Sequence, residues 1–400
     1  MPPIEIKPDV YWIGVNDRTT DLFEGLWPIT QEGVSYNAYL INDEKKAIVD
    51  LSKSLKTDDF FDQIHQIVDL SQLDYVILNH MEPDHTGVLR TLRRVVPDLK
   101  ILGTEKTRDM LEGFYGVTEN VEVVGDGDTL QLGEHTLRFV STPFVHWPET
   151  MMTYLEGEEV LFSCDAFGGY GALRGGIFDD QCTDFGFYEK EALRYYVNIV
   201  AVFSRPVLQA IATLKDVPVS VVAPSHGLIW RDNPGRIVEL YQEWAGYAGQ
   251  PGEVGVTLLY GTMYGNTEEM MNAVAQGVSN EGVSVDIFDA RRTHVSYILP
   301  SLWTKRGVIV GAPTYEGGLF PPVAETLNMA VTKRIRNKTT TYFGSYGWSG
   351  GARREFESLA GKLKWKMLEP LEFPGGPTDE DLRQGEAFGA AFAREIKAAA

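Results

Sequence analysis

The sequence predicts an α/β protein with two domains, the second of them a doubly wound parallel sheet. The chain has 400 residues with 44% hydrophobic content, which is enough to bury two full cores. Its pattern changes near residue 250, where the stretch 246–253 is rich in glycine and proline and is typical of a linker. After it, strand-like and helical runs alternate regularly. We therefore expect domains at residues 1–250 and 251–400.

The first domain shows short strand-like runs separated by helical stretches, which predicts stacked sheets flanked by helices. Strands are expected at 46–49, 73–78, 121–124, 136–141, 160–163 and 219–223, and helices at 86–96 and 188–214. The second domain is more regular. Expected strands at 255–260, 284–288, 307–310 and 340–343 alternate with expected helices at 267–281, 321–332 and 353–363. Such alternation is typical of a parallel sheet covered on both faces.

Charge and cysteine content limit the classes of function. A formal net charge of −20 and a pI near 4.8 argue against nucleic acid and anionic membrane surfaces as partners. The two cysteines, Cys164 and Cys182, are too few for a disulfide framework, a rubredoxin or an iron–sulfur module. We expect neither a signal peptide nor a membrane span, because no apolar run approaches the roughly 20 residues that cross a bilayer. These features together favour a soluble protein of the reducing cytoplasm.

Four metal-binding side chains crowd into six residues directly after the strand-like run 73–78; they are His80, Glu82, Asp84 and His85. We expect this cluster in a loop at the carboxyl end of the strand, where chemistry is commonly placed. A helix cap is the alternative explanation. Capping, however, needs one Asp or Thr rather than two imidazoles and two carboxylates. The cluster therefore indicates a metal site.

Three further candidate ligands each close a predicted strand: His146 follows 136–141, Asp165 ends 160–163, and His226 ends 219–223. Either histidine alone would be read as a core residue. If the strand ends share one rim, four imidazoles and three carboxylates meet, which is enough for two metal ions. Asp165 lies between the two distant histidines in the sequence and is the expected bridge. The remaining histidines stand in helical, turn or polar stretches and receive no role; they are His65, His135 and His294.

Three loops of the second domain form a candidate flavin site. The first, 262–267, is similar to the flavodoxin phosphate loop, because hydroxyls, an amide and the N–H groups of a helix start can hold a phosphate without a lysine. The loops 313–318 and 345–351 offer glycines for close approach and aromatic rings for stacking. A Gly-x-Gly-x-x-Gly fingerprint is missing after 255–260, which favours flavin mononucleotide (FMN) over NAD or FAD. The candidate residues are Thr262, Met263, Tyr264, Gly265, Asn266, Thr267, Pro313, Thr314, Tyr315, Gly317, Gly318, Ser345, Tyr346, Gly347, Trp348 and Gly350.

The metal cluster resembles that of the metallo-β-lactamase fold, whose hydrolases usually carry His-x-His-x-Asp-His. Here Glu82 replaces the second histidine, and a more oxygen-rich site favours iron over zinc for redox cycling. Together with the flavin loops, this variant resembles the flavodiiron proteins over nearly the whole chain. The resemblance implies an N-terminal metallo-β-lactamase-like αββα sandwich followed by a flavodoxin-like doubly wound parallel sheet.

The same resemblance implies an oxidoreductase that reduces O2 to water, NO to N2O, or both, using FMN and two non-haem irons. A separate rubredoxin or a reduced deazaflavin coenzyme would donate electrons, and the assembly would be a head-to-tail homodimer or a tetramer. A member of this family can leave the imidazole of His85 off the metal. One iron would take His80, Glu82 and His146, the other Asp84, His85 and His226, and both would share Asp165.

Several points stay open. Tyr264 stands where simple flavodoxins usually have threonine, so one hydroxyl contact to the phosphate is in question. A glycine-rich run, 168–176, follows Asp165 where relatives carry bulkier residues, and it is either a mobile lid or an irregular loop without a role in turnover. The alternatives to the oxidoreductase are a two-zinc hydrolase with an attached flavodoxin and a flavin electron carrier whose first domain is scaffold.

Overall fold

The computed structural model describes residues 1–398 and forms two compact units that divide between Ala245 and Gly246. The division falls at the end of a helix and beside the glycine- and proline-rich stretch 246–253. Domain limits of 1–250 and 251–400 stay predictions.

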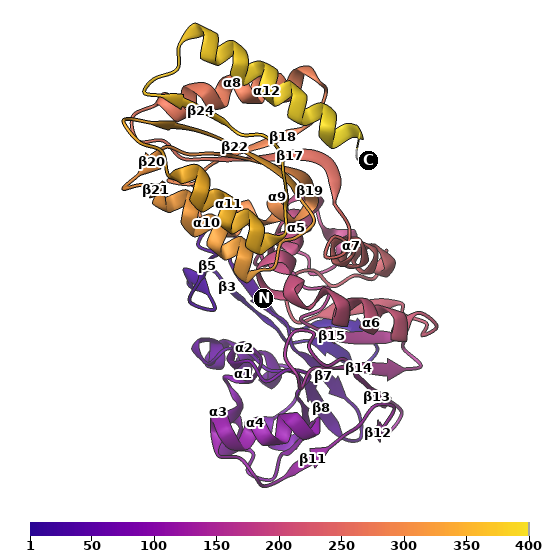
Figure 1. Ribbon diagram of the computed structural model, residues 1–400. Helices are drawn as coiled ribbons and strands as arrows, with labels where there is room; N and C mark the ends of the chain where they lie inside the picture. Colours follow the sequence, from indigo (N-terminus) through magenta and orange to yellow (C-terminus); the bar gives the residue numbers. More distant parts are fainter. Residues whose placement is uncertain (399–400) are drawn as a thin grey trace. The chain divides into compact units, whose positions relative to one another are not determined.

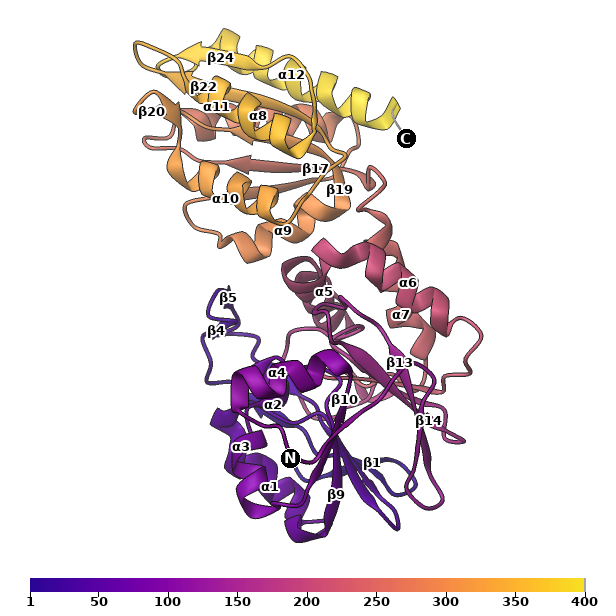
Figure 2. The same ribbon diagram turned by 60° about the horizontal axis from the view of Figure 1, so that its bottom comes forward.

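The first unit contains two sheets (Figures 1 and 2). The larger has seven strands in the order β1-β2-β7-β8-β9-β10-β11, and the smaller has five in the order β12-β13-β14-β15-β16. The larger sheet comprises β1 (Ile4–Lys7), β2 (Val10–Trp12), β7 (Tyr39–Asn42), β8 (Lys46–Val49), β9 (Leu73–Ile77), β10 (Lys100–Gly103) and β11 (Val121–Val123). The smaller comprises β12 (Thr129–Gln131), β13 (Thr136–Ser141), β14 (Met151–Glu156), β15 (Val160–Cys164) and β16 (Val221–Pro224). Two short pairs complete the strands: β3 (Val15–Asp17) with β6 (Val34–Tyr36), and β4 (Leu22–Phe23) with β5 (Trp27–Pro28).

Helices flank these sheets: in Figures 1 and 2, α1 to α4 gather along the larger sheet and α6 and α7 along the smaller. Local sequence sets their limits. Helix α4, for example, begins after Thr104, whose hydroxyl accepts from the Thr107 amide, and ends at Gly116, whose φ is 66°. The helices are α1 (Thr57–His65), α2 (Pro83–Thr86), α3 (Leu89–Val95), α4 (Glu105–Tyr115), α5 (Phe185–Tyr195), α6 (Ser204–Leu214) and α7 (Pro234–Gly246). Short 3-10 turns cover Ser54–Lys56, Leu70–Gln72, Asp179–Gln181 and Ala201–Phe203.

Strand direction brings the candidate ligands to corresponding strand ends. Strand β15 is parallel to β16, and β13 is antiparallel to β14, which is antiparallel to β15. Strands β13, β15 and β16 therefore run the same way, and each is followed by a candidate ligand at its carboxyl end. In the larger sheet, β9 pairs in parallel with β8 and β10 and ends just before the cluster that begins at His80.

The cluster itself lies only partly in a loop. Asp84 and His85 belong to α2, which starts at Pro83 with Glu82 as its extended N-cap residue. The expectation of a loop followed by one helix from 86 to 96 is therefore wrong in detail, because proline fits the first position of a helix and starts a turn three residues early. The second helical piece, α3, begins only at Leu89.

The predicted helix 188–214 is a longer, interrupted run. It starts with α5 at Phe185, passes through a π turn at Tyr196–Val200 and a 3-10 turn, and ends with α6. By length and composition alone, Phe185–Leu214 could cross a membrane, but half of its apolar window is buried inside the unit. A buried core helix passes the same test, so this run is weak evidence for a membrane span.

The second unit is a parallel sheet with helices on both faces. Its strand order is β18-β17-β19-β22-β23, with β24 also pairing with β22. Helices α8 and α12 cover one face, and α9, α10 and α11 cover the other (Figure 1). The strands are β17 (Glu253–Tyr260), β18 (Val285–Asp289), β19 (Lys305–Gly311), β22 (Thr339–Tyr346), β23 (Lys366–Met367) and β24 (Leu371–Pro374). The helices are α8 (Asn266–Asn280), α9 (Val295–Thr304), α10 (Pro321–Thr332), α11 (Ala352–Leu363) and α12 (Asp379–Ala398).

Two predicted loops of this unit contain strand residues. The stretch 313–318 holds a small hairpin, in which β20 (Thr314–Tyr315) pairs with β21 (Gly318–Leu319). Strand β22, expected at 340–343, continues to Tyr346 because β24 pairs with its last residues. Ser345 and Tyr346 therefore stand at a strand end rather than in a free loop.

Candidate metal and flavin sites

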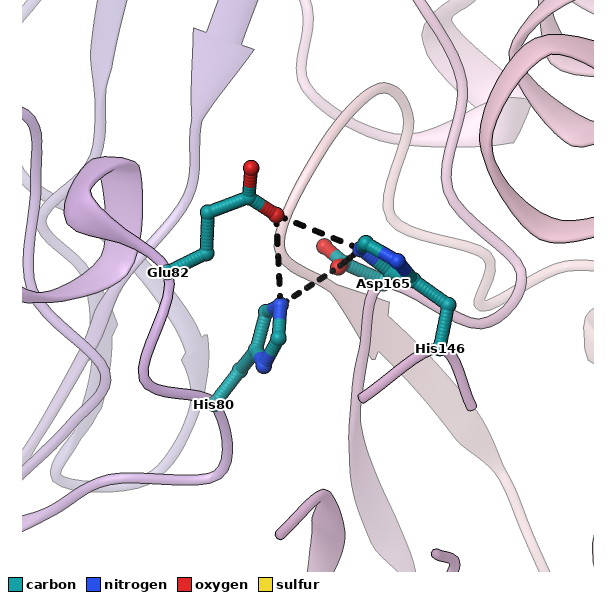
Figure 3. A group of neighbouring side chains, drawn as sticks. All are labelled: His80, Glu82, His146 and Asp165. Atoms are coloured by element: carbon teal, nitrogen blue, oxygen red, sulfur yellow. Dashed lines mark hydrogen bonds and ion pairs between the residues drawn. The ribbon is translucent and has the colours of Figure 1, made fainter. Parts of the chain in front are cut away.

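Four side chains from three separate segments meet in the first unit (Figure 3). Nε2 of His80 lies 3.3 Å from Oε2 of Glu82 and 3.4 Å from Oδ2 of Asp165. Nε2 of His146 lies 3.2 Å from the same two oxygens. Figure 3 shows both imidazoles and both carboxylates pointing toward one another, which is the arrangement of ligands around one cation.

A second group lies on the other side of Asp165. Its Oδ1 is 3.0 Å from Nε2 of His85 and 3.3 Å from Nε2 of His226. The two oxygens of Asp84 complete this group, with Oδ1 3.7 Å from His85 and Oδ2 3.4 Å from His226. The structure thus brings all seven predicted side chains together and places Asp165 between two groups, with one oxygen facing each.

The carboxylate of Asp165 is held where strand β15 ends. Its backbone carbonyl accepts from the Gly168 amide at 3.0 Å, which closes a tight turn after the strand. A Cβ on Gly169 would lie 2.9 Å from Cα of Ala192, so only glycine lets this turn approach helix α5 so closely.

The first half of the glycine-rich run 168–176 is buried and hydrogen-bonded to neighbouring segments. The Gly171 amide donates to the Gly33 carbonyl at 3.0 Å, and the Ala172 amide donates to Glu32 at 2.9 Å. The Tyr241 hydroxyl also donates to the Gly168 carbonyl at 2.8 Å. These bonds tie the run to neighbouring segments, and its glycines allow close packing there. The mobile lid and the irregular loop both stay predictions.

The opposite ring nitrogens of two histidines are also fixed. Nδ1 of His80 lies 2.7 Å from Oε1 of Glu149, and Nδ1 of His226 lies 2.7 Å from the Ser35 carbonyl. Since each partner is an acceptor, each Nδ1 donates a proton, so Nε2 is the ring nitrogen that a cation would bind in place of a second proton. Glu149 was not among the residues expected from the sequence. Its only signal is its position three residues after His146 in His-Trp-Pro-Glu.

The site strongly favours positive charge. Burial lowers the pKa of His80, but contacts with Glu149 and Glu82 outweigh burial and raise it to about 10. Burial likewise lowers the pKa of His85, but the charges of Asp165 and Asp84 raise it to about 10. Burial raises the pKa of Asp165, yet the neighbouring imidazoles hold it well below its usual range. Protons and cations compete for such a field, so the same charges that raise these imidazole pKa values would attract metal ions.

The donor atoms of the two groups fit metal ions. Several are buried and make no hydrogen bond within residues 1–398: both oxygens of Asp84, Oδ1 of Asp165, and Nε2 of His85, His146 and His226. Buried polar atoms without partners are costly, and a bound ion would satisfy them. Two groups that share one carboxylate fit two ions rather than one.

The second unit contains a cavity of about 460 Å³ formed by the three candidate flavin loops. Two aromatic residues that line this cavity are almost fully exposed to solvent: Tyr264 is 92% exposed and Trp348 is 96% exposed. Exposed rings at the edge of a cavity can stack on a planar ligand such as a flavin ring. The predicted residues that line the cavity are Met263, Tyr264, Asn266, Pro313, Thr314, Tyr315, Gly317, Ser345, Tyr346, Gly347 and Trp348.

The first loop has the features of a phosphate site. The Gly265 amide donates to Oγ1 of Thr262 at 3.0 Å, and Gly265 has a φ of 103° where helix α8 begins. Oγ1 of Thr267 is buried without a hydrogen-bond partner in the described chain. An orphaned hydroxyl at a helix N-terminus fits an anion that accepts from it.

Some predicted flavin residues are not among those that line the cavity; they are Thr262, Gly265, Thr267, Gly318 and Gly350. Two lining residues, Glu316 and Ser349, belong to the predicted loops but were not among the individual candidates, and Gly375 lies outside every predicted loop. Gly375 follows strand β24, and a Cβ on its neighbour Gly376 would lie 3.5 Å from Oδ1 of Asn266. In the sequence, the glycine pair Gly375-Gly376 after the run 371–374 could have indicated that this fourth segment also belongs to the flavin site.

The first domain has two stacked sheets and two groups of potential metal ligands, and the second is a parallel sheet of the flavodoxin type; together they define one class of oxidoreductases. Residues 34–227 match the ODP family beta lactamase, and residues 258–389 match flavodoxin. The chain is 36% identical to the anaerobic nitric oxide reductase flavorubredoxin of Escherichia coli K12, over 98% of this chain and 82% of that protein.

Solved structures that resemble this chain belong to the same class of protein. Rubredoxin oxygen:oxidoreductase from Desulfovibrio gigas has a TM-score of 0.93 and 31% identity, covering 99% of both chains. The flavodiiron protein from Giardia intestinalis has a TM-score of 0.94 and 27% identity, covering 100% of this chain and 97% of that one. The chain belongs to the flavodiiron protein family and is an oxidoreductase. The predicted fold class, with its metallo-β-lactamase-like and flavodoxin-like domains, is confirmed.

Proposed function

We propose that this flavodiiron oxidoreductase binds two irons and FMN and reduces O2 to water, NO to N2O, or both. The observation that carries the proposal is the position of Asp165, whose two oxygens face two separate imidazole–carboxylate groups at 3.0 to 3.4 Å. The names of two relatives, a nitric oxide reductase and a rubredoxin oxygen:oxidoreductase, support both substrates.

The ligand assignment follows the two groups. Glu82 makes the first group richer in oxygen than a three-histidine zinc site, which supports iron. For His85, which the family resemblance leaves open, the support is its Nε2, 3.0 Å from Asp165 and without a hydrogen bond within residues 1–398. The proposed sets are His80, Glu82 and His146 for one iron, Asp84, His85 and His226 for the other, and Asp165 for both.

The electron count fits the proposed cofactors. Reduction of O2 to two waters consumes four electrons and four protons, and reduction of two NO to N2O and one water consumes two of each. When bound, FMN and two irons together store four electrons and pass them on singly. The protein's own residues fix geometry: Glu149 and Ser35 orient two imidazoles, and the Thr262–Thr267 loop would hold the FMN phosphate.

We further propose that the electrons come from a separate rubredoxin or a reduced deazaflavin coenzyme, since two cysteines cannot form a four-cysteine iron site in this sequence. The proposed assembly is a head-to-tail homodimer, or a tetramer built from it, in which the flavin unit of each chain serves the iron unit of the other. The proposed compartment is the cytoplasm, supported by free Cys164 and Cys182.

Anaerobic steady-state kinetics test the proposal. Purified protein with about two irons and one FMN per chain should consume O2, NO or both when each candidate donor is supplied in turn. A sample that holds zinc and hydrolyses esters or lactams without a reductant would instead support the hydrolase. A metal-free sample that still passes electrons would support the carrier.

A further inference from the structure

One histidine of each ligand group makes a short hydrogen bond through Nδ1, and the two acceptors differ. Nδ1 of His80 donates to a carboxylate, Oε1 of Glu149, at 2.7 Å. Nδ1 of His226, in the other group, donates to a neutral backbone carbonyl, that of Ser35, at the same distance. The two hydrogen bonds have the same length, so the difference between their acceptors is one of charge. The second group has a buried carboxylate nearby as well, Asp50, whose ligand atom lies within 4.8 Å of that of His85.

Glu149 is built into its position. Its side chain is 1% exposed, and its Oε1 also accepts from the Met81 amide at 2.9 Å. The Thr104 hydroxyl donates to its backbone carbonyl at 3.0 Å. Two N–H donors on one oxygen favour the ionised carboxylate. Its second oxygen, Oε2, has no hydrogen-bond partner in the described chain. A structural role alone would not require a buried charge here, because an amide oxygen could accept the same two bonds.

A carboxylate behind an imidazole changes what the imidazole does to a metal. It fixes the proton on Nδ1, directs the Nε2 lone pair at the ion, and makes the ring more electron-donating. Greater donation from a buried negative charge stabilises the ferric state more than the ferrous state. A neutral carbonyl orients the ring in the same way but adds no net charge.

We propose that Glu149 is a positioning residue that makes the two irons unequal, so that the iron bound by His80 is oxidised at a lower potential than the iron bound by His226. The inference rests on the proposed diiron site and adds a direction to it. During reduction of O2 or NO, the iron backed by Glu149 would be the first to give up its electron.

The test uses Glu149→Gln in the full-length, iron- and FMN-loaded protein. Glutamine keeps an oxygen for Met81 and His80 and removes only the charge. The control is Asp43→Asn, which removes the carboxylate from a similar pair, His135 Nδ1 and Asp43 Oδ2 at 2.9 Å, among residues that belong to neither ligand group. Iron content and the two one-electron potentials of the iron pair are measured, the latter by redox titration followed by electron paramagnetic resonance.

In Glu149→Gln we expect the lower potential to rise, by an order of 10-fold in the ferric-to-ferrous ratio, which is about 59 mV for one electron. The higher potential should move less, so the gap narrows and the mixed-valence signal weakens, while Asp43→Asn matches the parent. Unchanged potentials, or an equal shift of both, at full iron content would overturn the proposal. If Glu149→Gln fails to fold, Glu149→Asp decides. It keeps the charge on a shorter arm, so potentials close to those of the parent protein support the proposal, and a rise of the lower potential as large as that expected for loss of the charge rejects it. Failure of the parent protein to bind iron would count against the proposed function instead.

Discussion

Replacing Asp165 by alanine tests the two-iron site most directly. In the structure this one carboxylate faces four imidazoles, with Oδ2 toward His80 and His146 and Oδ1 toward His85 and His226. Alanine would remove one ligand from each group at once. The change therefore acts on both ions, whereas loss of any of the other six ligands acts on one.

The size of the effect follows from the ligand count. Each proposed iron falls from four protein side chains to three, and four imidazoles lose the carboxylate between them. Loss of a group that only supports a ligand already costs about 10- to 100-fold in metal affinity, so loss of a direct ligand should cost at least that much. We expect iron to fall from about two per chain to about one or less, while FMN content stays at the parent level.

Elemental analysis by mass spectrometry and flavin absorbance on the same sample measure both quantities. Asp43→Asn is a matched control, because this carboxylate pairs with His135 and belongs to neither ligand group, and it should keep full iron. Full iron content in Asp165→Ala would refute the bridging assignment. Loss of both iron and FMN would instead indicate general misfolding.

Three further predictions concern the flavin, the assembly and stability. Thr262→Asp should abolish FMN binding through like-charge repulsion with the phosphate and leave iron unchanged, as flavin and iron analysis will show; retained FMN would contradict the phosphate loop. Mixing this variant with Asp165→Ala under conditions of subunit exchange should restore part of the activity that each lacks. Exchange proven by mass without recovery would mean that electrons pass within one chain. Burial lowers the pKa of Lys338 from 10.5 to about 7. Between pH 7 and pH 10.5 the unfolded chain therefore binds more protons at this lysine than the folded chain does. The unfolding free energy of the flavin unit should rise with pH across that window, by about 5 kcal/mol at most. Urea titration followed by flavin fluorescence should show that the unfolding free energy depends less on pH in Lys338→Met than in the parent, and equally in the control Lys362→Met, whose lysine is exposed. The same pH dependence in Lys338→Met and the parent would contradict the lowered pKa of Lys338.

The sequence determined much of the chemistry by itself. The four ligands between His80 and His85 are local, and a strand followed by alternating metal-binding side chains is visible without a structure. The β/α alternation after residue 253 is equally local, because period-2 and period-3.6 patterns depend only on neighbouring residues. Helix α10 was predicted with its observed limits, 321–332, since a proline pair marks its start.

Tertiary structure decided what depends on contacts between distant segments. The extension of β22 to Tyr346 depends on its pairing with β24, and the burial of the glycine-rich run after Asp165 depends on packing against segments such as that of Gly33. Glu149 lies 69 positions from His80, so nothing in a local pattern joins them. The split of the ligands into two groups around Asp165 likewise follows from how strand ends from two sheets meet. Residue type and spacing set which atoms can bind a metal, but only the folded chain sets which of them face one another.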